Sequence, residues 1–174
     1  RMHYLDEGAG APVVFVHGNP TWSFHWRELI KALRGAHRCI APDHIGMGLS
    51  DKPGDARYSY TLESRVRDLD NLLEHLNARD GVSLVLHDWG GLIGMAWAAR
   101  HPQAVKRLVI LNTSAFHLPK SKPFPWQLRL ARTPLGALLV RGLNLFAGRA
   151  VKDCVTRCAL PPDVREAYLF PYNS

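Results

Sequence analysis

Short apolar runs alternate with segments of helical periodicity along the first two thirds of the chain. Four runs rich in β-branched residues and leucine predict buried strands, at residues 13–16, 38–41, 82–86 and 107–111. Apolar residues at helical spacing predict helices between these strands, at about residues 21–33, 61–76 and 92–100. The repeated order of strand and helix predicts an α/β fold, in which helices flank a mostly parallel sheet.

The segment 61–76 has the clearest helical pattern. Its apolar residues fall on one side, and Thr61 stands immediately before the first of them. A threonine in that position can accept a hydrogen bond from one of the free backbone N–H groups of the first turn. We therefore expect Thr61 to be the N-cap of this helix.

The pattern changes near residue 117. Three prolines between residues 119 and 125 interrupt the alternation, and helical periodicity resumes at 126–146, with a break at Pro134, and again at 150–160. Such a segment is typical of an inserted cap rather than of a further strand and helix. The predicted domains are the N-terminal part of an α/β core at residues 1–116 and a partial helical cap at residues 117–174.

Length and composition place the chain among ordinary globular proteins. Its 174 residues suffice for one sizeable core, and 47% of them are hydrophobic. No apolar run reaches the length of a membrane span, so we expect no transmembrane segment. The chain does not begin with Met and stops at residue 174 without a helix stop or strand end. We therefore expect that both ends are cut and that the fold is incomplete at the C-terminus.

The net charge of +7 is concentrated near the C-terminal end. Residues 120–174 contain nine Lys or Arg against three Asp or Glu, which gives +6 of the +7. A solvated helical face is the ordinary explanation. The alternative is a surface that binds an acidic protein or a membrane. No nucleic-acid-binding motif accompanies the charge, so we expect no nucleic acid partner.

The cysteines are few and odd in number, which predicts a reduced protein in the cytoplasm. Two of them, Cys154 and Cys158, are four residues apart and fit one face of a helix, whereas Cys39 stands alone. No histidine or acidic residue completes a metal-binding set with that pair. We therefore expect neither a metal ion nor another cofactor.

The hexapeptide Leu-His-Asp-Trp-Gly-Gly at residues 86–91 carries the main chemical signal. It joins the strand at 82–86 to the helix at 92–100, and two glycines follow Asp88 where a tight turn brings strand and helix backbones together. An aspartate after a strand often caps the next helix. The glycines favour the other interpretation, a nucleophile elbow whose nucleophile is the Asp88 carboxylate. Leu86 departs from the glycine expected two residues before a serine nucleophile.

The His-Gly-Asn-Pro turn at residues 17–20 supplies a second part of the same site. It follows the first predicted strand and can direct the backbone N–H of Asn19 toward the point that the backbone N–H of Trp89 also faces. Two such donors form an oxyanion hole. Asn19, Asp43 and Asp88 all follow predicted strands, so we expect them to line one crevice at the carboxyl ends of the strands.

These motifs carry a family resemblance. Residues 17–20, 42–53 and 87–91 resemble the haloalkane dehalogenase branch of the α/β-hydrolase superfamily. Within that branch, residues 111–116 and 118–126 are most similar to the β-lactone decarboxylases of bacterial long-chain olefin synthesis. The resemblance implies the α/β-hydrolase fold with the start of a helical cap. It also implies a small apolar substrate, either a long-chain β-lactone or a haloalkane.

The resemblance assigns roles to residues of the elbow and the turn. It implies that Asp88 is the nucleophile and that the side-chain N–H groups of Asn19 and Trp89 stabilise a departing halide or carboxylate. Indole and amide donors suit that role, because they stabilise an anion without adding a charge that would neutralise the nucleophile.

The triad acid and the histidine are expected outside these residues. One subgroup of dehalogenases has its triad glutamate at the position of Asn112, so here the acid should follow a later strand. In this superfamily the histidine comes after the acid, and only His101 and His117 follow Asp88. Neither is expected to be the base, which we place beyond residue 174.

Structural roles are expected for the other polar residues near the elbow. Neighbouring residues on a strand point to opposite faces, so His87 should be buried away from the site, and Asp43 and His44 should stabilise their turn. Five cap residues either wall an apolar pocket over Asp88 or simply pack within the cap: Phe124, Trp126, Leu139, Leu143 and Phe146.

Together these inferences favour an enzyme with an aspartate nucleophile, most closely a cis-β-lactone decarboxylase that forms an olefin. The first alternative is a haloalkane dehalogenase, in which a histidine-activated water cleaves the alkyl ester, and epoxide hydrolysis ranks third. The alternative that is not an enzyme is an incomplete or non-catalytic hydrolase-like module that binds a ligand or a partner. A sheet that ends at the strand 107–111 would leave an open edge that favours association.

Overall fold

The described residues form two compact units. The computed structural model describes residues 1–116, 121, 126–131 and 133–172. The first unit is Arg1–Ala115, which we name the sheet unit, and the second is Phe116–Ser174, which we name the helical unit. All strands of the described residues belong to the sheet unit.

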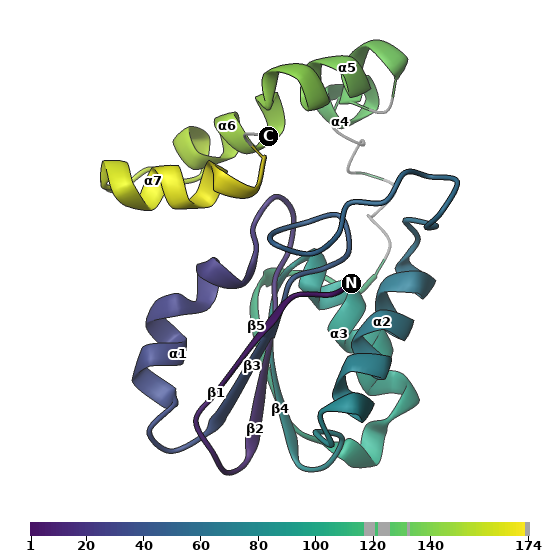
Figure 1. Ribbon diagram of the computed structural model, residues 1–174, viewed down its shortest axis with the longest axis vertical. Helices are drawn as coiled ribbons and strands as arrows, with labels where there is room; N and C mark the ends of the chain where they lie inside the picture. Colours follow the sequence, from purple (N-terminus) through teal and green to yellow (C-terminus); the bar gives the residue numbers. More distant parts are fainter. Residues whose placement is uncertain (117–120, 122–125, 132, 173–174) are drawn as a thin grey trace. The chain divides into compact units, whose positions relative to one another are not determined.

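Five strands form the sheet (Figure 1): β1 (Tyr4–Glu7), β2 (Pro12–Val16), β3 (Arg38–Pro42), β4 (Val82–Asp88) and β5 (Val105–Thr113). Their order across the sheet is β1-β3-β2-β4-β5. The pairs β2–β3, β2–β4 and β4–β5 are parallel, and β1 pairs antiparallel with β3. The predicted α/β fold with a mostly parallel sheet is therefore confirmed.

Strand β1 is one that the periodicity does not predict. Only Tyr4 and Leu5 of its four residues are apolar, and none is fully buried. Its backbone pairs with β3, Leu5 packs against the core, and Asp6 accepts two hydrogen bonds from the guanidinium of Arg38 on β3, at 2.9 and 2.6 Å. An edge strand held in this way leaves no apolar alternation in the sequence.

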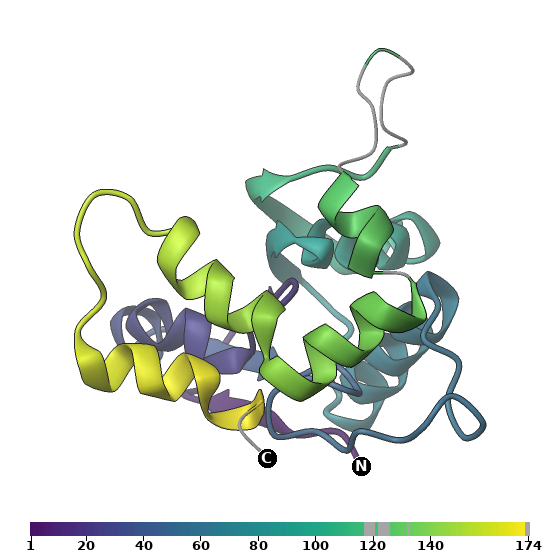
Figure 2. The same cartoon turned by 90° about the horizontal axis from the view of Figure 1, so that it is seen from above.

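Three α-helices cover the two faces of the sheet. α1 (Arg27–Leu33) lies on one face, and α2 (Leu62–His75) and α3 (Trp89–Arg100) lie on the other (Figures 1 and 2). The helices predicted at 61–76 and 92–100 correspond to α2 and α3.

The helix predicted at 21–33 begins later than expected. A 3-10 turn, η1 (Ser23–Trp26), precedes α1. The N–H groups that would start a longer helix are bonded to loops, since the Thr21 N–H donates to the Gly18 carbonyl and the Ser23 N–H donates to Asp43 Oδ1. These contacts tie the segment to the turn at residues 17–20 and to Asp43 after β3.

The core consists of two apolar layers on opposite sides of the sheet. Val14 and Val16 of β2 belong to the layer that includes residues of α2 and α3, and Val13 and Phe15 belong to the layer beside α1. A strand that is buried on both faces has a continuous apolar run rather than an alternating one. This is why β2 is evident in the sequence although β1 is not.

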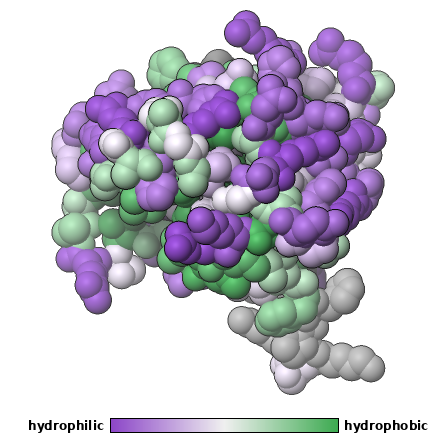
Figure 3. All heavy atoms as spheres, turned by 90° about the horizontal axis from the view of Figure 1, so that it is seen from below, coloured by the Kyte–Doolittle hydropathy of each residue, from purple (hydrophilic) through white to green (hydrophobic). Residues whose placement is uncertain are grey.

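Strand β5 pairs with β4 alone among the described strands. Its apolar residues Leu108, Val109, Ile110 and Leu111 are between 39% and 54% exposed. Among the described strands, β5 is therefore the last on its side of the sheet. The face in Figure 3 shows hydrophobic side chains at the surface in patches between hydrophilic ones.

The described part of the helical unit contains α4 (Trp126–Ala131), α5 (Pro134–Leu143), α6 (Leu145–Asp153), α7 (Pro162–Leu169) and the 3-10 turn η3 (Phe170–Tyr172). The predicted break at Pro134 is present, because α5 begins there after the N-cap Thr133, which accepts a hydrogen bond from the Gly136 N–H at 3.1 Å. Within the ranges that the structure describes, no helix combines the length and the apolar character needed to cross a membrane.

The prediction of a helix at residues 150–160 is wrong. α6 begins earlier, at Leu145. The residue before it, Asn144, adopts a left-handed conformation with φ of 48° and ends α5. α6 ends at Asp153, and the next helix begins only at Pro162, since proline fits a first helical turn but not a helix interior. Cys154 and Cys158 therefore do not share a helix face, and both are exposed free thiols.

Thr61 is the N-cap of α2, as the sequence predicts. Its backbone is extended, with φ of −101° and ψ of 163°, and its side-chain oxygen accepts a hydrogen bond from the Ser64 N–H at 3.2 Å. The bond satisfies one of the four N–H groups that the first helical turn leaves free.

We predict that Thr61→Val lowers the free energy of unfolding by about 1 kcal/mol, because valine keeps the shape of threonine but removes the capping oxygen. Urea denaturation of the full-length protein measures the change. Thr61→Ser is the matched control and should unfold within about 0.5 kcal/mol of the wild type. Equal stability of Thr61→Val and the wild type would show that the cap does not stabilise α2.

Candidate active site

Asp88 occupies a sharp turn between strand β4 and helix α3. Its φ of 51° and ψ of −126° lie in a left-handed region that residues other than glycine rarely adopt. Such a conformation costs about 1–3 kcal/mol and persists only where surrounding contacts impose it. The turn lies where the sequence predicts an elbow, and its geometry points to a function rather than to simple helix capping.

Glycines at three positions allow the backbones to approach one another around this turn. A Cβ atom on Gly90 would overlap the carbonyl oxygen of Val16 at the end of β2. A Cβ atom on Gly18 would overlap the Asp88 side chain, and one on Gly91 would overlap the side chain of Thr113 on β5. The elbow therefore packs directly against both strands that neighbour β4.

The Asp88 carboxylate is held by the turn at residues 17–20. The backbone N–H of Asn19 donates to Asp88 Oδ1 at 2.8 Å. Among the residues that the structure describes, Oδ2 has no hydrogen-bond partner, and no Lys, Arg or His pairs with the carboxylate. Asp88 is half-buried, so the group has one oxygen fixed by the protein and one oxygen available for chemistry.

Trp89 follows Asp88 as the first residue of α3. Its backbone N–H has no partner within the helix, as in any first turn, and its side chain is 53% exposed. The expected oxyanion hole of Asn19 and Trp89 stays a prediction. In this structure the Asn19 N–H is bonded to the carboxylate of Asp88 itself.

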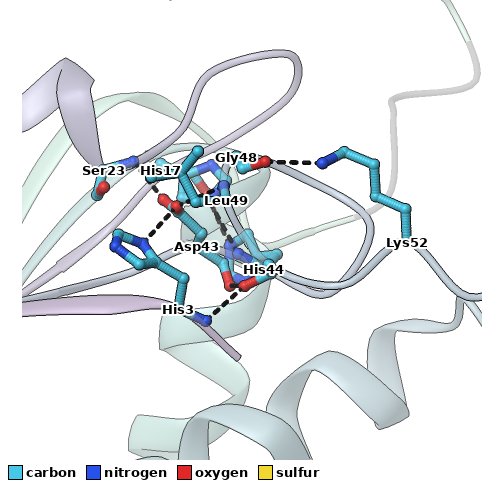
Figure 4. Close-up of polar contacts among 9 residues, drawn as sticks. His3, His17, Ser23, Asp43, His44, Gly48, Leu49 and Lys52 are labelled. Carbon is cyan, nitrogen blue, oxygen red and sulfur yellow. Dashed lines mark hydrogen bonds and ion pairs between the residues drawn. The ribbon is translucent and has the colours of Figure 1, made fainter. Parts of the chain in front are cut away.

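Asp43 has the structural role that the sequence predicts for it, and it does not line a crevice with Asn19 and Asp88. Its side chain is completely buried and accepts hydrogen bonds from the N–H groups of Ser23 at 2.6 Å and Leu49 at 2.9 Å (Figure 4). Its Oδ2 also lies 2.8 Å from Nδ1 of His3. Both carboxylate oxygens are engaged, so Asp43 organises the loop around it.

A pair of buried histidines fixes the backbone next to Asn19 (Figure 4). The His44 N–H donates to His17 Nε2 at 3.1 Å, and His44 Nε2 lies 3.0 Å from the His17 carbonyl oxygen. His17 Nδ1 lies 2.8 Å from the Gly18 carbonyl oxygen. His17 must carry its proton on Nδ1 and His44 must carry one on Nε2, because only donors satisfy those carbonyl groups. The pair joins the loop after β3 to the turn that holds Asp88.

Burial keeps these two histidines neutral. It lowers the pKa of His17 well below its usual value, and the neighbouring His44 lowers it further. Burial also lowers the pKa of His44 to about 4, with a smaller effect from the charge of Arg65. A neutral imidazole at His17 is what the bond from the His44 N–H requires, since only an unprotonated Nε2 accepts it.

His87 and His101 are not in a position to act on Asp88. The ring of His87 stacks on that of His25 at 4.8 Å, and its Nδ1 is buried without a hydrogen-bond partner among the described residues. His101 is the C-cap of α3, about 20 Å along the helix from Asp88, and its Nε2 lies 3.0 Å from Asp70 Oδ1. His117 lies outside the described residues.

The cap residues belong to the helical unit. The Trp126 side chain is 68% exposed, whereas Leu139 and Phe146 are half-buried. Phe124 and the side chain of Leu143 lie outside what the structure describes. A pocket wall made by these five residues therefore stays a prediction.

Asn112 and Thr113 at the end of β5 are site residues that the sequence reasoning misses. The Thr113 hydroxyl donates to the backbone carbonyl of Asp88. In the sequence, Asn112 indicates only that the triad glutamate of one dehalogenase subgroup is absent at this position. In the structure its φ is 41°. An asparagine tolerates a left-handed backbone better than most residues, and that was the available signal for an irregularity at the end of this strand.

Comparison with known protein families matches residues 11–162 to the alpha/beta hydrolase fold. The cis-3-alkyl-4-alkyloxetan-2-one decarboxylase of Shewanella oneidensis is 55% identical over 175 residues, which cover 100% of this chain and 55% of the relative. The enzyme of the same name from Xanthomonas campestris is 52% identical and is covered over 60% of its length, with 99% of this chain aligned. The chain thus spans between 55% and 60% of these curated relatives.

Haloalkane dehalogenases are more distant relatives. The enzyme of Sphingobium indicum is 40% identical over 165 residues, which cover 90% of this chain and 54% of the relative. The crystal structure of the haloalkane dehalogenase DatA from Agrobacterium tumefaciens superposes with a TM-score of 0.85 at 31% identity, over 99% of this chain and 59% of that one.

We predict that His44 makes the protein less stable in mild acid. Its pKa is about 4 in the folded protein and returns to its usual 6.5 on unfolding, so the unfolded chain binds more protons between these values. The free energy of unfolding should therefore fall as the pH drops from 6.5 toward 4, by on the order of 3 kcal/mol for this residue. Urea denaturation at several pH values measures the loss.

The control is His44→Gln, which keeps a side-chain N–H donor but does not titrate. Its free energy of unfolding should depend less steeply on pH over the same range. Identical pH dependence in the variant and the wild type would contradict the assignment.

Proposed function

The chain belongs to the α/β-hydrolase family, and we propose that it carries the nucleophile of an enzyme that converts a cis-3,4-dialkyl β-lactone to an alkene and carbon dioxide. The substrate class is taken from the two relatives named cis-3-alkyl-4-alkyloxetan-2-one decarboxylase, since an oxetan-2-one is a four-membered lactone. Because the chain spans only part of those relatives, the activity is proposed for the full-length protein.

The observation that carries the proposal is the environment of the Asp88 carboxylate. One oxygen is held by the Asn19 N–H at 2.8 Å, and the described residues place no cation against the group. By contrast, both oxygens of the buried Asp43 are engaged in holding its loop. A fixed carboxylate with a free oxygen can instead attack carbon and form a covalent ester.

Attack on ring carbon 4 fits a β-lactone. Asp88 forms an alkyl ester at that carbon while the C4–O bond breaks, and its electron pair leaves with the ring oxygen as a carboxylate attached to carbon 3. Loss of carbon dioxide then forms the C3–C4 double bond and releases Asp88 as a free carboxylate. The alkene and carbon dioxide contain every atom of the lactone, so neither water nor a redox reagent is consumed.

Asn19 and Trp89 are proposed to stabilise the anion that forms in the first step. The Asn19 turn meets Asp88, and the exposed Trp89 side chain adjoins it in the sequence. Neutral N–H donors stabilise a carboxylate leaving group without forming an ion pair with the nucleophile.

Haloalkane dehalogenation is the second candidate, because relatives with that name are 40% identical and the DatA structure has the same fold. Here the Asp88 ester would be cleaved by an activated water that attacks the ester carbonyl. That route needs a histidine near the ester to activate the water.

The basic segment and the compartment are proposed on composition alone. The charge of +6 in residues 120–174 suits an acidic protein or a membrane surface. The free thiols of all three cysteines suit a reducing cytoplasm.

We predict that Asp88→Ala abolishes alkene formation from a long-chain cis-β-lactone in the full-length protein, by at least about a thousandfold in kcat, because the nucleophile is removed. Gas chromatography of the alkene measures the loss. Asp55→Ala removes an exposed carboxylate of the same unit and should keep wild-type kcat. Turnover by Asp88→Ala at the wild-type rate would refute the nucleophile assignment.

The two routes differ in the oxygen atoms of Asp88. Turnover of the lactone in water enriched in oxygen-18 should leave the peptide that contains Asp88 at its natural mass, because Asp88 departs with its own two oxygens. Turnover of a 1-bromoalkane by the second route would place heavy oxygen in that peptide. Mass spectrometry after digestion distinguishes them, and heavy oxygen in Asp88 during alkene formation would overturn the lactone route.

A further inference from the structure

The end of β5 contains a bulge opposite the elbow. In the pairing of β4 with β5, His87 is opposite Leu111 and Asp88 is opposite Thr113, so Asn112 is the extra residue. Asn112 accommodates the bulge with a φ of 41°. A β-bulge redirects the side chains that follow it, and here the residue that follows is Thr113.

The redirected Thr113 side chain bonds to the elbow. Its hydroxyl donates to the backbone carbonyl of Asp88. The absence of a side chain at Gly91 leaves room for it, since a Cβ atom there would overlap Thr113. Three features, the bulge at Asn112, the hydroxyl of Thr113 and the glycine at 91, therefore produce one contact.

Asp88 is thus held from both neighbouring strands. From the β2 side, the Asn19 N–H fixes the carboxylate oxygen Oδ1 at 2.8 Å. From the β5 side, the Thr113 hydroxyl fixes the backbone carbonyl of the same residue. The backbone of Asp88 is strained, with φ of 51°, so without the second contact its peptide group can rotate to relieve the strain and move the carboxylate from Asn19.

We propose that Thr113 is a positioning residue for Asp88, which holds the strained peptide so that the carboxylate stays on the Asn19 N–H and faces the substrate. This inference rests on the proposed role of Asp88 as nucleophile. It assigns Thr113 no contact with the substrate, so its removal should slow the reaction without weakening substrate binding.

The test compares Thr113→Val, which keeps the shape and removes the hydroxyl, with Thr113→Ser, which keeps the hydroxyl. In the full-length protein with a long-chain cis-β-lactone, we expect Thr113→Val to lower kcat about 10- to 100-fold, as for a misplaced reacting group. KM should stay within about twofold. Thr113→Ser should keep kcat within about threefold of the wild type.

Thr61→Val is the matched control, because it also exchanges a threonine hydroxyl for a methyl group and destabilises the sheet unit, but far from Asp88 in the chain. It should leave kcat unchanged. Wild-type kcat in Thr113→Val would overturn the proposal, and so would a loss in Thr113→Ser as large as that in Thr113→Val.

A second readout does not depend on the reaction. The amide proton of Asn19 reports the bond to Asp88 in NMR spectra of the full-length protein. In Thr113→Val it should move upfield and exchange with solvent about tenfold faster, whereas in Thr113→Ser it should keep its wild-type position. An unchanged Asn19 amide in Thr113→Val would overturn the positioning role.

Asp88→Ala separates failure of the inference from failure of the proposed function. An inactive Asp88→Ala together with a fully active Thr113→Val would leave the nucleophile in place and refute positioning by Thr113. An active Asp88→Ala together with a displaced Asn19 amide in Thr113→Val would refute the proposed function and keep the contact between the residues.

Discussion

The left-handed backbone of Asp88 is the constraint on which the rest of the site depends. Its φ of 51° turns the chain from β4 directly into α3 and directs the carboxylate toward the turn at residues 17–20. The strain is imposed by close packing, since β2 and β5 both approach the elbow where Gly90 and Gly91 lack side chains. Close packing thus holds Asp88 in a conformation that the chain would otherwise avoid.

Asp43, directly after β3, and Asp88, at the end of β4, have different environments. Asp43 is completely buried and is bonded at both oxygens, so it fixes its loop. Asp88 is half-buried and is bonded at one oxygen to Asn19. The buried pair His17 and His44 joins the two regions, because it connects the loop of Asp43 to the turn that holds Asp88.

The sequence alone predicts the elements that are held in place by burial of their apolar side chains. Strand β2 and the helices α2 and α3 produce apolar runs or helical periodicity, and Thr61 stands at a helix start. Strand β1 is held by its pairing with β3, by Leu5 and by the contacts of Asp6, and the position of Thr113 depends on a bulge at Asn112 that pairing between distant strands creates. Neither has a local apolar pattern. The elbow could be predicted because its two glycines are a packing requirement visible in the sequence, whereas the single bond from Asn19 to Asp88 required the fold.

As the proposed nucleophile, Asp88 becomes covalently bound to the substrate, and trapping that ester is the most direct test of its role. The full-length protein is mixed with excess long-chain cis-β-lactone, quenched in acid within one turnover, digested and examined by mass spectrometry. We expect the mass of the opened lactone on the peptide that contains Asp88, with the peptide that contains Asp43 unmodified. Alkene formation with the adduct on another peptide, or with no adduct at any quench time, would contradict it.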